Sequence, residues 1–210
     1  NGQNSILVYP GANQKLDTHY IDREWEKILA HDVFLLQLEI PIETVIYTVT
    51  RLREAGKTII LDPAPAQPLP DSLISAVDYL TPNLFELESL TKLPVDDEDK
   101  IKKAATQLIE RGAKRVITKA GPAGAYITEA DSTNNRAAFH VEVLDTTAAG
   151  DAFNAGFAVA LARNETINDA ARFANAVAAL SITGAGAQSA MPTLDQTEAL
   201  LATRFPKLKK

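Results

Sequence analysis

Short apolar runs alternate along the chain with longer segments whose hydrophobic residues recur every three or four positions. The short runs are rich in Val, Ile and Leu and end at turn-forming residues, which is typical of buried strands. We therefore predict strands at residues 5–9, 33–38, 58–61, 79–80, 115–118, 125–128 and 137–141. The longer segments have helical periodicity, and they predict helices at residues 18–30, 42–55, 71–77, 83–90, 97–112, 149–163, 167–182 and 194–203.

This alternation of strands and helices predicts an α/β fold. Strand–helix–strand units build a parallel sheet with helices on both faces, so we expect three α/β/α layers around a mostly parallel central sheet. No internal repeat, low-complexity tract or long linker divides the 210 residues, which predicts one domain over residues 1–210. We predict a loop at the polar residues 131–135 and a solvated tail at the basic residues 207–210.

The composition narrows the range of functions. Lys and Arg number 21 against 27 Asp and Glu, and the net charge of −6 argues against nucleic acid or an anionic membrane as a partner. The chain has no cysteine, which excludes disulfides, thiolate zinc sites and a cysteine nucleophile and fits a cytoplasmic location. The three histidines show no metal-ligand spacing, and no apolar run approaches the roughly 18 residues that cross a bilayer.

Residues 144–156 are the most informative for chemistry. Here a strand leads through a run of small residues into a helix, and the free N–H groups of a first helical turn form an anion site. Asp151 lies at this helix start, where a carboxylate either stabilises the helix end or acts as a general base beside a phosphate in transfer. The small residues Ala152, Ala155, Gly156 and Val159 predict a helix face packed closely on the sheet.

Two further strand ends offer complementary groups. Asn83 and Glu86 are three residues apart at a helix start, so they can form a capping box, organise magnesium and phosphate, or do both. The glycine-rich residues 120–124 and 184–189 fit either ordinary turns or a nucleotide loop. The chain has no GxxxxGK[ST], GxGxxG or GxSxG motif, which argues against a P-loop NTPase, a dinucleotide dehydrogenase and an α/β-hydrolase.

Taken in order, these motifs resemble one family. Residues 145–151, Asp-Thr-Thr-Ala-Ala-Gly-Asp, closely resemble the Asp-Thr-x-Gly-Ala-Gly-Asp signature of the ribokinase-like (pfkB) sugar kinases. The resemblance extends over essentially the whole chain, through residues 11–13, 36–39, 62–66, 81–83 with Glu86, and 186–188 with Pro192. It implies a ribokinase-like fold and an ATP-dependent transfer of the γ-phosphoryl group to the primary 5-hydroxyl of a pentose, ribose or deoxyribose.

The resemblance also implies a role for individual residues. Asp151 matches the catalytic base, and the amides of Ala148, Ala149 and Gly150 match the anion hole. Glu39 matches an acid that contacts the sugar, Asn83 and Glu86 match the pair that organises phosphate and magnesium, and Asn175 matches a position beside adenine. The nucleotide loop matches Thr118, Gly121 and Gly124, and a potassium site matches Asp145, Thr147, Ser181, Gly184, Gly186 and Ala190. The implied cofactors are therefore ATP, Mg²⁺ and K⁺.

The sequence departs from the family pattern in several ways. Ala190 lacks the hydroxyl that relatives often offer to potassium, and the stretch at residues 118–121 is one residue longer than usual. The longer stretch puts Lys119 near the phosphates, where it either helps to bind ATP or is a solvated side chain. The chain does not begin with Met, and nothing in it matches the family's first strand, its β-lid and its Gly-Gly sugar motif.

The last departure leaves alternatives open. We expect a fragment, a cleaved chain or an incomplete chain, with an uncovered sheet edge that favours association. In the family the lid often builds a homodimer, which therefore does not carry over to this chain. The alternative functions are a catalytically impaired fragment, a non-catalytic nucleotide-binding module, and a kinase of another acceptor such as a nucleoside, a hexose phosphate or a vitamin precursor.

Overall fold

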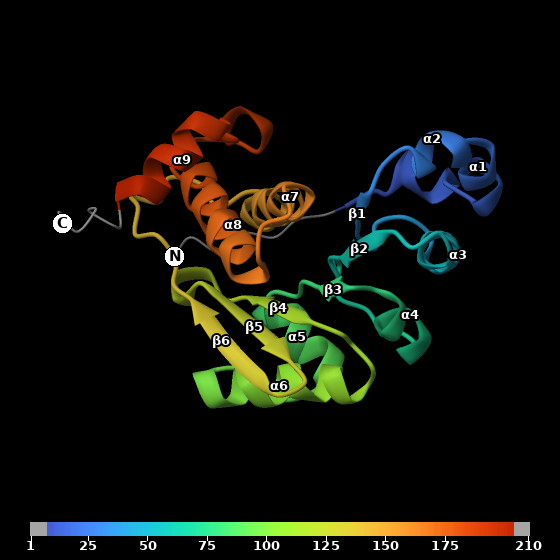
Figure 1. Cartoon of the computed structure of the whole chain (residues 1–210), viewed down its shortest axis with the longest axis horizontal. Helices are drawn as coiled ribbons and strands as arrows, with labels where there is room; N and C mark the ends of the chain where they lie inside the picture. The colour runs from blue at the N-terminus through green and yellow to red at the C-terminus, as the bar shows by residue number, and fades with distance from the viewer. Residues whose placement is uncertain (1–7, 204–210) are drawn as a thin grey trace.

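A six-stranded sheet forms the centre of the molecule in the computed structural model, which describes residues 8–203 (Figure 1). The strands are β1 (Val33–Leu36), β2 (Thr58–Leu61), β3 (Tyr79–Leu80), β4 (Val116–Lys119), β5 (Ala125–Glu129) and β6 (Ser132–Arg136), and they lie in this order across the sheet. β1 to β4 are parallel, while β5 and β6 pair antiparallel. The predicted mostly parallel sheet is therefore confirmed.

Helices cover both faces of this sheet. Helices α3, α5 and α6 contact β2, β4 and β5 on one face, and α7 and α8 contact β1, β5 and β6 on the other. The helices are α1 (Thr18–Arg23), α2 (Trp25–Leu29), α3 (Ile42–Glu54), α4 (Asp71–Ala76), α5 (Leu84–Thr91), α6 (Glu98–Glu110), α7 (Ala149–Ala162), α8 (Ile167–Ser181) and α9 (Leu194–Thr203). Short 3-10 turns at η1 (Gly11–Lys15), η2 (Gly121–Ala123) and η3 (Gln188–Ala190) complete the elements.

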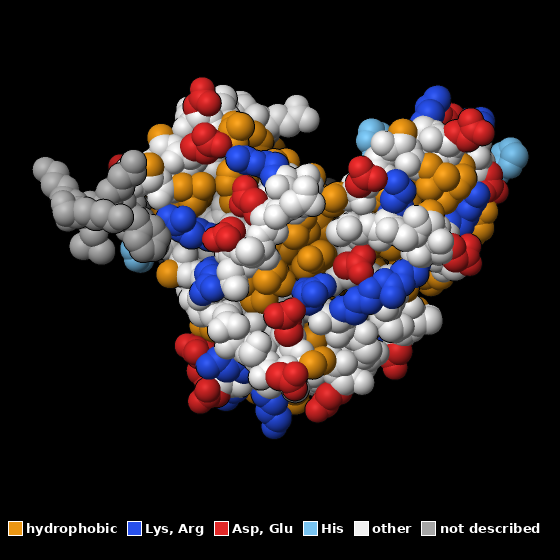
Figure 2. All heavy atoms as spheres, in the orientation of Figure 1, with side chains coloured by type: hydrophobic (Ala, Val, Ile, Leu, Met, Phe, Trp, Pro, Cys, Tyr) orange, Lys and Arg blue, Asp and Glu red, His pale blue; other side chains and the backbone are white. Residues whose placement is uncertain are grey.

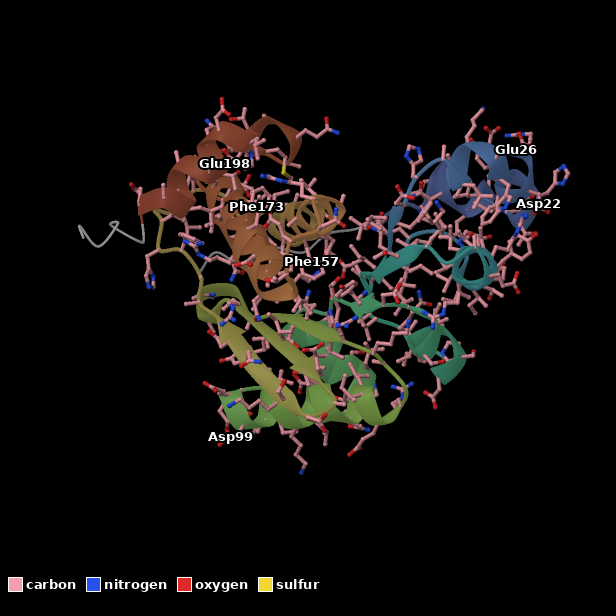
Figure 3. All side chains as sticks on the ribbon, in the orientation of Figure 1. Asp22, Glu26, Asp99, Phe157, Phe173 and Glu198 are labelled. Atoms are coloured by element: carbon pink, nitrogen blue, oxygen red, sulfur yellow. The ribbon has the colours of Figure 1, made fainter. Side chains whose placement is uncertain are left out.

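The alternation of side chains along the strands explains this three-layer arrangement. Ile59 and Leu61 of β2 join the core beneath α3 to α6, whereas Ile60 between them joins the core under α7 and α8. Because successive side chains of a strand point to opposite faces, each apolar strand fills two cores at once. On the α7 side, the rings of Phe157 and Tyr79 meet edge-on with their centroids 5.2 Å apart, and Figure 3 shows Phe157 between the helices and the sheet, with Phe173 farther out toward α9.

The structure corrects the prediction for the last strand. β6 is the polar stretch Ser132–Arg136, which we predicted to be a loop, while the predicted strand at residues 137–141 has no regular structure. β6 pairs only with β5 and is mostly exposed, so cross-strand hydrogen bonds rather than apolar burial define it. Phe139, from the segment predicted as a strand, is buried instead against Ala176 and Ala179 of α8.

Two smaller predictions also changed. The helix predicted at 18–30 is two short helices that meet at Glu24, which serves as the end of one and the start of the other. In the strand predicted at 5–9, Val8 and Tyr9 are exposed and belong to no strand, and residues 5–7 lie outside the described part of the chain. The tail predicted at residues 207–210 also lies outside it. The remaining helices and strands begin and end within two residues of their predicted bounds.

The small residues of α7 serve a different contact from the one predicted. Ala155 and Val159 are exposed, so only Ala152 and Gly156 of the predicted face are buried. Gly156 faces α8 rather than the sheet, because a Cβ there would come within 2.9 Å of Val177 and 3.1 Å of the Ala174 backbone. The close approach therefore fixes α7 against α8.

At the outer edge of the described sheet, β1 has no second neighbouring strand, and Leu35 of this strand is 43% exposed.

Among residues 8–203, none of the helices has the length and apolar character needed to cross a bilayer.

Candidate functional site

The carboxyl ends of β2, β3 and β4 converge with the start of α7. Asp62 follows β2, Asn83 follows β3, and Lys119 is the last residue of β4. The N–H of Lys119 donates to the carbonyl oxygen of Pro82 at 2.8 Å, which ties the end of β4 to the end of β3. In an open α/β sheet this edge is where ligands bind.

A buried ion pair lies at the centre of this edge. The ammonium of Lys119 donates to Oδ2 of Asp62 at 2.8 Å, and the two side chains are only 10% and 8% exposed. The lysine also reaches the start of α7, because a Cβ added to Gly150 would lie 3.6 Å from its Nζ. Of the two roles predicted for Lys119, the solvated side chain is therefore wrong.

Asn154 of α7 completes this ion pair. Its side-chain Nδ2 donates to the same Oδ2 of Asp62 that the lysine contacts. The other carboxylate oxygen of Asp62 and the Oδ1 of Asn154 are buried without a partner among the described residues. Burial raises the pKa of the Asp62 carboxyl, the charge of Lys119 opposes that shift, and the charge of Asp151 adds to it. Asp151 thus lies close enough for its charge to act on Asp62.

Asn83 and Glu86 form the predicted capping box at the start of α5. The Oδ1 of Asn83 accepts the N–H of Glu86 at 2.8 Å, and the two carboxylate oxygens of Glu86 accept the N–H and the Nδ2 of Asn83 at 2.8 and 2.7 Å. Burial raises the pKa of Glu86, while the nearby charge of Lys119 lowers it. A carboxylate has about four lone-pair sites, so these two bonds leave capacity for a water of a hydrated magnesium ion.

The first turn of α7 presents free backbone donors. Ala149 donates its N–H to the carbonyl of Thr146 at 3.2 Å, whereas the N–H groups of Ala148, Gly150 and Asp151 have no acceptor among residues 8–203. Ala148 adopts a left-handed conformation, with φ 61°, at a position where the family signature has glycine. The side chain of Asp151 is exposed beside these donors. Of the three predicted anion-hole amides, Ala148 and Gly150 are thus available and Ala149 is engaged.

An apolar cavity of about 380 Å³ extends from this turn along α8. Ala149 and Thr146 line the end nearest to α7, and Gly121, Asn175 and Ile182 line the rest together with Pro122, Ala138, Phe139, His140, Val141, Val143, Ala178 and Ala179. Asn175 uses its Nδ2 to donate to the carbonyls of Arg136 and Ala137, at 2.7 and 3.3 Å. It therefore shapes the wall of the cavity through the segment after β6.

Of the residues predicted to bind potassium, Thr147 and Gly186 are bonded to Asp145. Its Oδ1 accepts the N–H and the hydroxyl of Thr147, and its Oδ2 accepts the N–H of Gly186 at 2.9 Å. These bonds, the one from the Thr147 hydroxyl first, lower the pKa of Asp145. Ala190 packs against Gly184, while the hydroxyl of Ser181 is turned to the carbonyl of Ala178 within α8. The described residues contain no cluster of three or more His, Asp or Glu side chains that could hold a metal ion.

The other predicted residues lie apart from this set. Thr118 is fully buried, and its hydroxyl has no partner among the described residues. Gly124 is needed for backbone packing, because a Cβ there would lie 2.1 Å from the carbonyl oxygen of Arg136. Glu39 is exposed after β1, and its N–H, rather than its carboxylate, bonds to Gln37.

Sequence reasoning missed Asp62 and Asn154 as members of the site. Asp62 stands directly after the buried strand β2, which is a signal that could have identified it. Asn154 is one helical turn beyond Asp151 and carried no such signal until α7 was seen to lie over the strand ends.

This arrangement combines three chemical capacities. Free amides at a helix start and an ammonium bind a polyanion, an apolar cavity beside them binds a planar group, and an exposed carboxylate at the helix start can accept a proton. Transfer of a phosphoryl group needs positioning, charge stabilisation and one base more than it needs covalent chemistry from the protein.

Comparisons with known proteins agree with this chemistry. Residues 1–194 match the family model described as pfkB family carbohydrate kinase. The chain is 38% identical to the ribokinase of Haemophilus influenzae over 195 residues and 38% identical to the deoxyribokinase of Salmonella typhi over 197, covering 93% of this chain in both cases. The solved structure of Arabidopsis thaliana ribokinase with ribose and ATP superposes with a TM-score of 0.89 at 33% identity, over 96% of this chain and 66% of that one.

The chain spans 64% of the length of these two bacterial relatives.

Proposed function

This chain belongs to the pfkB family of carbohydrate kinases, and from that premise we propose that it carries the nucleotide-binding and phosphoryl-transfer part of an ATP-dependent pentose kinase. The observation that supports this most strongly is that the apolar cavity reaches the first turn of α7, because Ala149 and Thr146 line it and the residues with free amides, Ala148 and Gly150, flank Ala149. A nucleoside in the cavity would direct its phosphates toward Gly150 and Lys119. We propose residues 1–210 as one domain.

In this proposal several of the groups described above have a role. The amides of Ala148 and Gly150 and the ammonium of Lys119 stabilise the transferring γ-phosphoryl group. Asp151 accepts the proton of the sugar hydroxyl, and Glu39 contacts the sugar from the loop after β1. The acceptor is the primary 5-hydroxyl of ribose or deoxyribose, as the names of the bacterial relatives suggest.

The metal ions of the proposal fit the oxygen donors at the two places described above. Glu86 would hold a water of the magnesium ion that accompanies ATP, and that ion would neutralise charge on the phosphates. Asp145 and the loop from Gly184 to Ala190 would hold potassium, with a backbone oxygen or water in place of the hydroxyl that Ala190 lacks. ATP as phosphoryl donor is consistent with a cytoplasmic location.

A second candidate function is nucleotide binding without turnover. Asp151 and Glu39 are both exposed, so water has access to the acceptor side of the site. Phosphoryl transfer to a sugar requires that the hydroxyl be held and that water be excluded.

Two measurements on this 210-residue chain separate these functions. Calorimetric titration with MgATP tests nucleotide binding, and ribose-dependent release of ADP tests transfer. Binding with ribose-dependent release supports the kinase, binding without release supports the second candidate, and the absence of binding contradicts both. A panel of ribose, deoxyribose, a nucleoside and a hexose phosphate then tests the acceptor.

A further inference from the structure

We propose that Asp62 and Asn154 are positioning residues that hold the Lys119 ammonium at the start of α7, where it binds the terminal phosphate of the nucleotide. This inference rests on the proposed nucleotide site and assigns roles to Asp62 and Asn154, residues that no step of that proposal uses.

The hydrogen bonds of the ammonium leave donors for a ligand. A lysine ammonium has three N–H groups, and within residues 8–203 that of Lys119 donates to Asp62 and to no other acceptor. Its Nζ lies 3.6 Å from the place where a Cβ of Gly150 would be, next to the free N–H groups of α7. The remaining N–H groups and the free amides can therefore bind the same anion.

Burial explains why this lysine needs an acidic partner. A buried ammonium without a carboxylate loses its proton readily, whereas a paired one stays charged. Asn154 fixes the carboxylate by donating to the same Oδ2, and it is 1% exposed and therefore held rigidly within α7. The carboxylate in turn fixes the lysine side chain, which otherwise has four rotatable bonds. Preorganised charge of this kind is what stabilises a transferring phosphoryl group.

An ordinary structural ion pair does not account for the unsatisfied atoms. Among residues 8–203, Asp62 Oδ1 and Asn154 Oδ1 are both buried without a hydrogen-bond partner, and each such atom costs free energy unless a water or a ligand satisfies it. The matching pair at the other end of the same strands, Lys114 with Asp78 at 2.6 Å, is more exposed, with side chains 33% and 19% accessible. The second carboxylate oxygen of Asp78 accepts the N–H of Ile59.

The test is nucleotide affinity by calorimetry on this chain. Lys119→Met is expected to weaken MgATP binding by about 10- to 100-fold, the range for a hydrogen bond to a charged group, and to change adenosine and MgADP binding by no more than about twofold. Lys119→Arg is expected to retain most of the MgATP affinity, and Lys114→Met, the matched control, all of it.

A double variant tests the positioning role. If Asp62 acts through Lys119, Asp62→Asn weakens MgATP binding alone, but Asp62→Asn/Lys119→Met binds MgATP no more weakly than Lys119→Met. Asn154→Ala is expected to behave as Asp62→Asn does, with a smaller loss. The double variant also removes both buried charges, so it keeps the test valid if a single variant does not fold.

Each other outcome contradicts a distinct claim. Wild-type affinity in Lys119→Met, or an equal loss for ATP and ADP, overturns this inference and leaves the proposed function standing. Additive losses in the double variant overturn the positioning role of Asp62. A wild-type chain that binds no MgATP overturns the proposed function together with this inference.

Discussion

The two ends of the parallel strands β2, β3 and β4 both carry charged clusters, yet the clusters differ in how deeply they are buried and in how far their polar atoms are satisfied. At the carboxyl end, the side chains of Lys119 and Asp62 are about nine-tenths buried, and Asp62 Oδ1 has no hydrogen-bond partner in the described part of the chain. At the amino end, Arg53 and Lys114 share the Oδ1 of Asp78, Lys57 pairs with Asp32, and Arg115 pairs with Glu129. Figure 2 shows basic and acidic side chains interspersed at the surface over β2, β3 and α4.

Backbone conformation separates the two ends in the same way. Gly56 at the amino end, with φ 68°, and Gly121 at the carboxyl end, with φ 53°, adopt left-handed conformations without strain, whereas Ala148 at the carboxyl end carries a side chain at φ 61°. Unsatisfied polar atoms and strained backbone cost stability, and they persist where function requires them. The contrast fits the proposal that the carboxyl end carries the chemistry, while the ion pairs of the amino end stabilise the fold.

The largest expected effect is on turnover. Asp151→Asn removes the proposed base, so kcat for ribose-dependent ADP release should fall by about 10²- to 10⁴-fold. Asp78→Asn changes a carboxylate at the opposite end and should leave kcat unchanged at a temperature where the variant is folded. Steady-state kinetics of both variants check this, and an equal loss in both would remove the functional distinction between the two ends.

The next effect is on stability. Lys119→Met leaves Asp62 buried without its charge partner, which should lower the free energy of unfolding by about 3–5 kcal/mol. Lys114→Met breaks a more exposed pair and should cost about 1 kcal/mol or less. Urea unfolding measures both. Similar losses would mean that the solvent screens the two pairs alike.

The coupling within each pair is expected to differ as well. In a double-mutant cycle, Asp62→Asn and Lys119→Met should couple by about 2–3 kcal/mol, because removing both charges avoids the uncompensated one. The cycle of Asp78→Asn with Lys114→Met should give about 1 kcal/mol or less. A coupling near zero for the buried pair would show that water reaches it.

The strands and helices could be predicted from the sequence better than the contacts between the charged side chains could. The apolar strands and the capping box at Asn83 were predicted because burial and capping leave local patterns. The polar strand β6 was missed because an edge hairpin is defined by its pairing with β5, which no local pattern records. The partnership of Asp62 with Lys119 and Asn154 spans 57 and 92 residues, so only the folded sheet brings the three together.

A smaller effect is the pH dependence of the buried carboxylates. Burial raises the pKa of Asp62 and Glu86, whereas the exposed Asp96 on the approach to α6 has its pKa lowered, chiefly by its hydrogen bond from Lys100. Where the folded pKa is raised, the native state binds more protons than the unfolded state, so these two groups reduce stability as pH rises from about 4 through their folded pKa values. The opposite sign holds for Asp96, whose contribution is lost as pH falls through its lowered pKa.

Carboxyl carbon NMR titration measures these values directly. Asp62 and Glu86 should titrate above Asp96, and the Asp62 resonance should be absent in Asp62→Asn, which assigns it. An Asp62 that titrates with the exposed acids would contradict the burial of the Lys119 pair.

The smallest effect compares the left-handed positions Gly56 and Ala148. A Cβ at Gly56 meets nothing within 4 Å, so Gly56→Ala measures the conformational cost alone and should destabilise the chain by about 1 kcal/mol. Ala148→Gly should act in the opposite direction, with a gain of about 1 kcal/mol or less, because the relief of the left-handed strain is offset by the greater unfolded-state entropy of glycine. Urea unfolding of the two variants tests this reciprocity. A loss in Ala148→Gly would show that the alanine methyl group contributes packing at the start of α7 that outweighs its strain, and the strain could then no longer be counted among the costs of the site.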